Sequence, residues 1–220
     1  MFALPAVDKQ AERLIELGVH TLAGLTEEQV REVSADREPD ALLILRDAKP
    51  SELAPLLVHR GKPGFVVADM VDVDLFTPIE TAPLPDAPMY SVHALTRGDE
   101  MENWSPEEAL VAIEAAGRTP LTLTEGLHWL LQVPDVLERG HCFMTIASRL
   151  RKPNGTLDAR TPAVWISNGT GRDGKDNRDA PKVGWCWVGN RHTWLGFASA
   201  AGRRPIVGSV HQPQEGQYLT

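Results

Sequence analysis

Residues 182–197 read KVGWCWVGNRHTWLGF and hold three of the six tryptophans, one of the two cysteines and one of the seven histidines. Side chains alternate along a strand, so Trp185 and Trp187 should share one face while Cys186 lies on the other. A solvated surface strand does not need such a concentration of rare side chains. We therefore predict that this segment packs against the core or binds a ligand.

Two more strands are predicted before this one, and only polar loops join the three. Because no helix separates them, the simplest arrangement is an antiparallel meander. The predicted strands are residues 142–147, 163–167 and 183–188.

Aromatic side chains from these strands would form one face if the registers align. Trp165 and Phe143 would then join Trp185 and Trp187. Such a face is either the surface against which helices pack or a stacking platform for a flat ligand.

The first half of the chain alternates helical and extended patterns. Residues 41–45 (ALLIL) are uniformly apolar, which predicts a strand buried on both faces in the middle of a sheet. The βαβ-like alternation up to residues 65–67 suggests that part of the sheet is parallel. Helices are predicted at residues 7–17, from Thr26, at 51–58, after Ser105 and after Thr122, with another strand at residues 89–95.

We expect an α/β to α+β fold, with a mixed β-sheet, an antiparallel C-terminal meander and helices packed mainly on one face. Three helix starts carry a hydroxyl residue followed three positions later by Glu or Gln, the pattern of a capping box. His128 and Trp129 fall on the helix after Thr122 and are expected to pack in the core. Residues 1–203 are predicted to form one globular domain, and residues 204–220 a loose tail.

Composition excludes several classes of function. The 220 residues are 42% hydrophobic and 24% charged, which is ordinary globular usage. The net charge of −8 works against binding to nucleic acid or anionic membranes. No apolar run approaches the roughly 18 residues that span a bilayer, and charges at Asp8 and Lys9 interrupt any signal-peptide core. We therefore expect a soluble cytoplasmic protein whose thiols, Cys142 and Cys186, are reduced.

The turn at residues 59–64 (HRGKPG) carries three basic side chains. Arg60 and Lys62, with exposed backbone amides, suit a phosphate or carboxylate. Alternatively, the turn is solvated and its cations complement the end of the preceding helix.

Residues 169–175 read GTGRDGK and match a phosphate-binding loop up to its lysine. Asp176 replaces the hydroxyl residue that ligates magnesium, and no helix can begin in residues 177–181. The acidic side chains of this loop also lack the spacing of a calcium-binding loop. We therefore predict a flexible, solvated hairpin loop there.

Cysteine and histidine side chains raise the questions of zinc and of nucleophilic catalysis. His141 and Cys142 are adjacent on a strand and cannot both face one ion, so no metal is predicted. Cys186 as nucleophile with His192 as base is the weak catalytic candidate. A thiol between two tryptophans is more often structural. No cofactor is predicted.

The segments RGKPGF, TPLTLTEGL, GHCF, PAVWIS, PKVGWCWVGN and HTWLGFASA together resemble a family of uncharacterised, largely actinobacterial proteins catalogued as a domain of unknown function. The likeness runs from the first helix to about Arg203. It implies one integrated domain and supplies no activity, cofactor or partner. Compared with this family pattern, the loop at residues 168–179 is longer than expected.

Two functions remain open from the sequence. The first is a non-catalytic binding or interaction module for a protein or a small molecule. The second is a small-molecule enzyme that uses Cys186 and His192, with Arg60 and Lys62 holding an anionic group. A concave site lined by tryptophans would favour a small ligand, and a flat exposed patch a protein partner or a homodimer. The binding residues predicted for the first function are Trp185, Trp187, Asn190, Arg191, His192 and Trp194.

Overall fold

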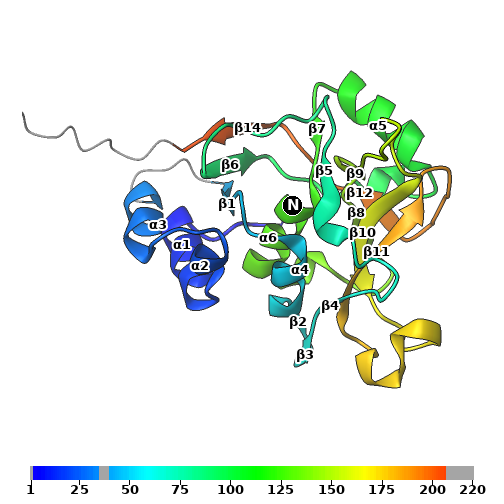
Figure 1. The fold of residues 1–220 in the computed structure, drawn as a ribbon, viewed down its shortest axis with the longest axis horizontal. Helices are drawn as coiled ribbons and strands as arrows, with labels where there is room; N and C mark the ends of the chain where they lie inside the picture. The colour runs from blue at the N-terminus through cyan, green and yellow to red at the C-terminus, as the bar shows by residue number, and fades with distance from the viewer. Residues whose placement is uncertain (1, 35–39, 207–220) are drawn as a thin grey trace, which may run out of the picture.

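The structure is a computed structural model that describes residues 2–34 and 40–206. A central helix, α6 (Leu123–Gln132), lies between two β-sheets (Figure 1). Eight of its ten residues are buried, and one hydrophobic cluster extends from it into both sheets. A helix that is covered on nearly every side is the element against which the rest of the chain packs.

The start of α6 is determined by the predicted capping box. The Thr122 hydroxyl accepts a hydrogen bond from the Glu125 backbone N–H at 3.3 Å, and the Glu125 carboxylate accepts one from the Thr122 N–H at 2.7 Å. Two N–H groups that a helix leaves unpaired are thereby satisfied. The same predicted arrangement begins α3 (Glu27–Ser34) at Thr26 and α5 (Pro106–Ala115) at Ser105.

One sheet has three antiparallel strands in the order β1 (Ala41–Leu45), β6 (Met89–His93) and β14 (Gly202–Pro205). All five residues of β1 are buried, as predicted. However, β1 forms an edge of the sheet, and its neighbour is antiparallel. The prediction of a central position was therefore wrong. The predicted parallel pairing does not involve β1 and occurs instead between residues 65–66 and 182–183.

Side chains take the place of a neighbouring strand at this edge. Gln10, on α1 (Val7–Glu16), donates from Nε2 to the Ala41 carbonyl at 2.7 Å and accepts from the Leu43 N–H at 2.9 Å. His128 Nε2 accepts from the Leu45 N–H at 3.2 Å. An edge strand can be fully buried only if its backbone groups find such partners.

The second sheet is mixed and contains the predicted C-terminal meander, which is confirmed. Strands β8, β10 and β11 are antiparallel neighbours, and parallel strands β12 and β4 flank them. The order across the sheet is β12 (Leu195–Phe197), β8 (Cys142–Met144), β10 (Arg160–Ile166), β11 (Pro181–Trp187) and β4 (Phe65–Val66). Together the sheets and helices form an α+β fold.

Helix α6 covers one face of this second sheet. Gly126 lies so close to it that a Cβ atom would be 2.7 Å from Thr145 Cγ2 and 3.1 Å from Phe143 Cε2. The ring of Trp129 contacts that of Phe143 at 5.7 Å between centroids. Phe143 is therefore part of the interface between helix and sheet.

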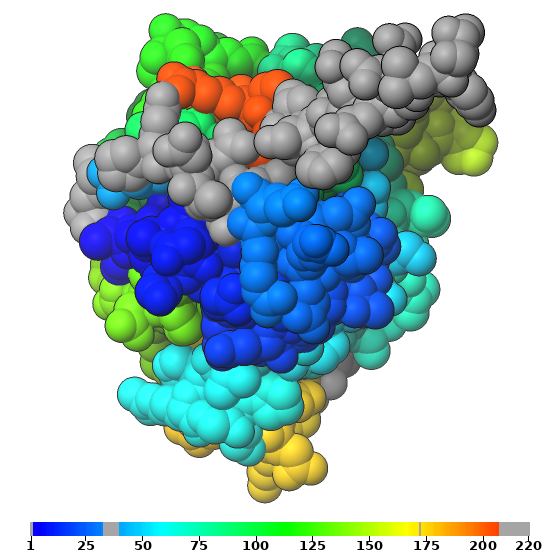
Figure 2. All heavy atoms as spheres, turned by 90° about the vertical axis from the view of Figure 1, so that its left-hand side faces the viewer, coloured from blue at the N-terminus to red at the C-terminus, as the bar shows by residue number. Residues whose placement is uncertain are grey.

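Helices α1 to α3 lie side by side on one side of the molecule, with β14 above them (Figure 2). None of the described helices is both long enough and apolar enough to cross a membrane. The other helical elements are α2 (Val19–Leu22), α4 (Pro50–Leu53), η1 (Ala54–Leu56), η2 (Val73–Leu75), η3 (Asp99–Met101), η4 (Pro134–Val136), η5 (Gly171–Asp173) and η6 (Lys175–Asn177). The other strands are β2 (Val58–His59) with β3 (Lys62–Pro63), β5 (Phe76–Pro78) with β9 (Ser148–Leu150), and β7 (Thr119–Pro120) with β13 (Ser199–Ala200).

The end of the chain differs from the expected boundary between residues 203 and 204. Arg204 and Pro205 belong to β14 and pair with β6. The rest of the predicted tail, residues 207–220, lies outside the described residues.

Candidate functional site

A pocket of about 310 Å³ opens on the second sheet, beside β4 and the loop that follows β10. Trp165 and Lys182 are direct cross-strand partners, so their side chains share one face of the sheet. Phe143 pairs with Val164 and belongs to the opposite face, which α6 covers. The pocket is lined by Phe65, Val67, Ala68, Asp69, Trp165, Thr170, Asp173, Lys182 and Trp185.

The absence of a side chain at Gly184 makes room for the Trp165 ring. A Cβ atom on Gly184 would lie 2.6 Å from Cη2 of Trp165 and 3.3 Å from Cγ1 of Val67. Glycine allows an indole to lie directly over the strand, because only hydrogen separates ring and backbone there. Trp165 thus presents an aromatic wall at the pocket.

An ion pair forms the polar wall of the pocket. Lys182 Nζ donates to both carboxylate oxygens of Asp173, at 2.6 and 2.9 Å, and lies 4.8 Å from the centroid of the Trp165 ring. The Ser167 hydroxyl also donates to Asp173, at 2.9 Å. The two charged side chains are only 15% and 11% exposed. Their charges cancel, so this wall offers hydrogen-bonding atoms without a net charge.

The basic turn at residues 59–64 does not line this pocket. Lys62 Nζ donates to the Asp176 carbonyl, and His59 Nδ1 donates to the Asp179 carbonyl, both at 2.7 Å. Arg60 is exposed, with φ +50°. The turn therefore binds the loop at residues 168–180. Because Lys62 already donates to a backbone carbonyl, this arrangement argues against the predicted anion site at Arg60 and Lys62.

The loop itself consists of two 3-10 turns, η5 and η6, and no α-helix begins in it. A helix N-terminus that would bind phosphate is therefore missing, in agreement with the prediction. Arg139 on the neighbouring segment donates to the side chains of Asn168 and Asp179, the latter at 2.6 Å. These bonds hold both ends of the loop against the sheet.

The strand register divides the predicted aromatic face. Trp185 pairs with Pro162, so alternation places its side chain with Phe143, whereas Trp165 belongs to the opposite face. The four rings therefore do not form one platform, although Trp185 contributes atoms to the pocket lining. Trp185 and Trp187 contact each other edge to face at 4.6 Å between centroids. Trp187 is 49% exposed and lies outside the pocket lining.

The turn after β11 is attached to the segment that precedes α5. Arg191 forms an ion pair with Glu108 and donates to the Asn103 carbonyl at 2.9 Å. The Asn103 N–H donates to the His192 carbonyl at 2.8 Å. Asn190 is exposed and does not line the pocket. These contacts give Arg191 and the backbone of His192 a structural role.

Trp194 follows this turn and contacts two other rings. Its centroid lies 6.2 Å from that of Trp165 and 5.2 Å from that of His192. Trp194 therefore packs against the ring that forms the aromatic wall. It is not among the residues that line the pocket.

The weak catalytic candidates are not assembled into a dyad. Burial raises the pKa of the Cys186 thiol to about 11, so the reactive thiolate is scarce near neutral pH. Burial also lowers the pKa of His192 below its ordinary value, and no described residue forms a hydrogen bond with its Nε2. The hydrogen bonds of the described residues include none between the two side chains. Nor do those residues place three or more His, Cys, Asp or Glu side chains together for a metal ion.

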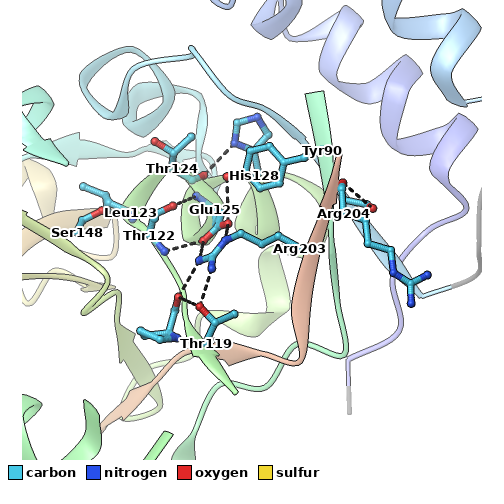
Figure 3. Close-up of polar contacts among 12 residues, drawn as sticks. Tyr90, Thr119, Thr122, Leu123, Thr124, Glu125, His128, Ser148, Arg203 and Arg204 are labelled. Carbon is cyan, nitrogen blue, oxygen red and sulfur yellow. Dashed lines mark hydrogen bonds and ion pairs between the residues drawn. The ribbon is translucent and has the colours of Figure 1, made fainter. Parts of the chain in front are cut away.

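A second polar cluster lies in the core, where α6 meets β14 (Figure 3). Arg203 donates from Nε and Nη2 to the two oxygens of Glu125, at 2.5 and 2.8 Å. The Tyr90 hydroxyl donates to the same carboxylate at 3.0 Å, and burial is the main cause that raises the pKa of Tyr90. Glu125 is 0% exposed and all its strong partners are internal, so this cluster joins the first sheet to α6.

Fold and pocket define an α+β protein with one aromatic-walled, polar pocket on a mixed sheet. The chain belongs to a family of unknown function, DUF5701, whose model matches residues 13–206. This confirms the resemblance to a domain of unknown function. Neither a search of curated proteins nor a search of solved structures found a match to this chain.

Sequence reasoning missed several residues that form the pocket. Phe65, Asp173 and Lys182 come from three separate segments, and none stands out by type. The signal that would have found them is the pairing of Trp165 with Lys182, which depends on the register of β10 against β11. Of the predicted binding residues, only Trp185 lines the pocket.

Proposed function

We propose that this protein is a non-catalytic binding module whose ligand is a small, neutral ring with a polar edge. The observation that carries this proposal is the concave pocket, in which the Trp165 indole faces hydrogen-bonding groups of Asp173 and Thr170. Its volume lies at the small end of the range of about 300–1,000 Å³ that is typical of ligand sites. One sugar or one nucleobase is a molecule of suitable size.

The charges of the pocket favour a neutral ligand. Lys182 and Asp173 neutralise each other, and Asp69 also makes a polar interaction. A charged ligand would have to compete with a pair that is largely shielded from water. A ring with hydroxyl or amide groups can instead donate to the remaining lone pairs of Asp173 while its flat face packs on the indole.

The pocket is tested by titrating pyranose sugars and free nucleobases while the indole N–H signal of Trp165 is followed by NMR. We expect one of these two classes to shift that signal with saturation. Trp165→Ala should then weaken binding at least about fivefold, because an aromatic contact is worth roughly 1–3 kcal/mol. Trp187→Ala is the matched control, since Trp187 lies on the same meander outside the pocket.

Trp187, which is exposed and contacts the half-buried Trp185 ring, supports a second candidate function, the docking of a protein partner or of a second copy of the chain. An exposed tryptophan is a typical anchor in protein interfaces. If Trp187→Ala abolished the binding of a ring ligand while Trp165→Ala left it unchanged, the pocket proposal would be overturned in favour of this surface. The pocket proposal would also be overturned if neither the sugars nor the nucleobases shifted the Trp165 signal.

Two further expectations come from the sequence. A net charge of −8 and the family resemblance are the grounds for proposing a cytoplasmic protein of an actinobacterium. Cell fractionation followed by immunoblotting of the native host tests the location.

A further inference from the structure

A second cavity, of about 530 Å³, forms an open groove at the other sheet. Its sides are the irregular segment 81–86, the turn at residues 117–119 between α5 and β7, and strand β14. Pro83, Leu84 and Pro85 contribute apolar side chains to the lining, and Arg118 contributes a guanidinium. This groove shares no lining residue with the pocket at Trp165.

Arg118 is held in place by neutral partners. Its Nε donates to the Ser199 hydroxyl at 3.0 Å, and its Nη2 donates to the carbonyls of Ala94 at 2.7 Å and of Ser199 at 3.1 Å. These acceptors come from β13 and from the residue after β6, so the guanidinium does not cap the carbonyls of α5. A guanidinium with three such bonds is oriented before any ligand arrives.

The remaining donors of Arg118 are on Nη1. Among residues 2–34 and 40–206, no acceptor bonds to Nη1 and no carboxylate forms an ion pair with Arg118. Ala94, whose carbonyl orients the guanidinium, has φ +51°, an unfavourable value for a residue with a Cβ atom. Backbone strain of this kind is concentrated at functional sites.

Two other charged side chains line the groove. Arg203 is one of them, but Glu125 neutralises this guanidinium, as Figure 3 shows. Asp86 is fully exposed and lies 3.4 Å from Arg46, which forms a shorter ion pair with Asp47 at 2.9 Å. Arg118 therefore supplies the single positive charge that has no acidic partner in the described part of the chain at this groove.

From this arrangement we infer that the groove binds a small monoanion, a carboxylate with an apolar body. The carboxylate accepts from the Nη1 donors of Arg118, and the apolar body packs on Leu84 and the prolines. One unmatched guanidinium suits a single negative charge better than a doubly charged phosphate. The ligand class thus differs in charge from that of the Trp165 pocket.

The probe for this site is benzoate, and benzamide is the neutral molecule of the same shape. With ¹⁵N-labelled protein, we expect benzoate to shift the amide signals of Gly117, Thr119 and Gly202 with saturation. Benzamide should shift them at least about tenfold less at equal concentration, because a charge-assisted hydrogen bond is replaced by a neutral one. The amides of Thr170 and Lys182, at the other pocket, should not move.

Two variants test the site in different ways. Arg118→Gln removes the charge and should weaken benzoate binding at least about tenfold. Gly202→Leu leaves Arg118 in place and should also weaken benzoate binding. Gly202 lines the groove and no atom lies within 4 Å of its missing Cβ, so the new side chain enters open space. Arg13→Gln, an exposed arginine on α1, is the control and should bind benzoate as the unchanged protein does.

Equal binding of benzoate and benzamide would overturn the inference, and so would benzoate shifts that fall outside the groove. Retention of the original affinity in Arg118→Gln would do the same. If Arg118→Gln does not fold, the comparison of the two probes on the unchanged protein, together with Gly202→Leu, still decides the matter.

Discussion

The imidazole Nε2 of His128 accepts a hydrogen bond from the backbone N–H of Leu45 at 3.2 Å. Its Nδ1 donates to the Thr124 carbonyl at 2.9 Å, so the ring must be the neutral tautomer with the proton on Nδ1. His128 is 0% exposed, and burial lowers its pKa from 6.5 to about 4. His128, on α6, thus supplies a hydrogen-bond acceptor at the edge of β1, and only the neutral imidazole can accept this bond.

This histidine predicts acid sensitivity of the fold. Between pH 6.5 and pH 4 the unfolded chain binds a proton at His128 that the folded chain does not, so the free energy of unfolding falls as the pH falls through this window. The expected loss from His128 is roughly 2–3 kcal/mol at pH 4.5 relative to pH 7.5. Urea denaturation at both pH values measures it.

The control for this prediction is the same measurement on two variants. His128→Gln should be less stable at pH 7.5 and should lose most of the difference between the two pH values. His141→Gln, at a side chain that is 53% exposed, should retain it. An unchanged pH difference in His128→Gln would assign the acid sensitivity to other groups.

Gln10→Ala is expected to destabilise the protein by about 3 kcal/mol, because it leaves the Leu43 N–H and the Ala41 carbonyl buried without partners. Hydrogen exchange gives a sharper test. The Leu43 amide should exchange faster in the variant, while the amides of Leu42 and Ile44, which alternate toward β6, should change only with global stability. Equal acceleration at all three would show that Gln10 does not protect the strand edge.

Glu125→Leu is expected to cost about 3–5 kcal/mol, because the guanidinium of Arg203 then stays buried without its carboxylate. The double variant with Arg203→Met should be less destabilised than the sum of the two single variants, since no charge remains buried. Chemical denaturation of the four proteins completes the cycle. Additive costs would mean that the two side chains do not depend on each other.

Gly184→Ala should destabilise by about 1–3 kcal/mol and shift the indole signal of Trp165, because the added Cβ would lie 2.6 Å from the ring. Gly189→Ala is the matched control: no atom lies within 4 Å of its missing Cβ. That variant should stay within about 0.5 kcal/mol of the original protein. A stable Gly184→Ala with an unmoved indole signal would contradict the placement of the Trp165 wall.

Cys186 should react slowly with iodoacetamide at pH 7.5. A pKa of about 11 leaves roughly a hundredfold less thiolate than in a free cysteine, and the rate should rise as the pH approaches 11. Peptide mass spectrometry separates Cys186 from Cys142, with glutathione as the reference thiol. Modification of Cys186 as fast as glutathione would revive the catalytic hypothesis.

Local sequence patterns predicted the helix starts and the meander correctly. The capping boxes at Thr26, Ser105 and Thr122 form within four residues, so no distant contact is needed to recognise them. The meander follows from three apolar strands that no helix separates.

The predicted aromatic face depended on two properties of the strands, their alternation and their register, and only alternation is local. Alternation along β11 separates Trp185 from Cys186 by sequence alone. Whether Trp165 joins Trp185 depends on which residues of β10 and β11 pair, and a shift of one position moves every side chain to the other face. That register placed Lys182 beside Trp165 and formed the pocket.

The sequence by itself thus determined where the capped helices begin and which segments form the meander, because capping and periodicity are local properties of the chain. The tertiary structure alone decided that β1 is a buried edge and that Arg118 Nη1, at a groove, has no acceptor among the described residues. Both depend on partners brought from distant positions: Gln10 and His128 for β1, and Ser199 and Ala94 for Arg118. Hydrogen bonds between such distant residues leave no local pattern in a sequence.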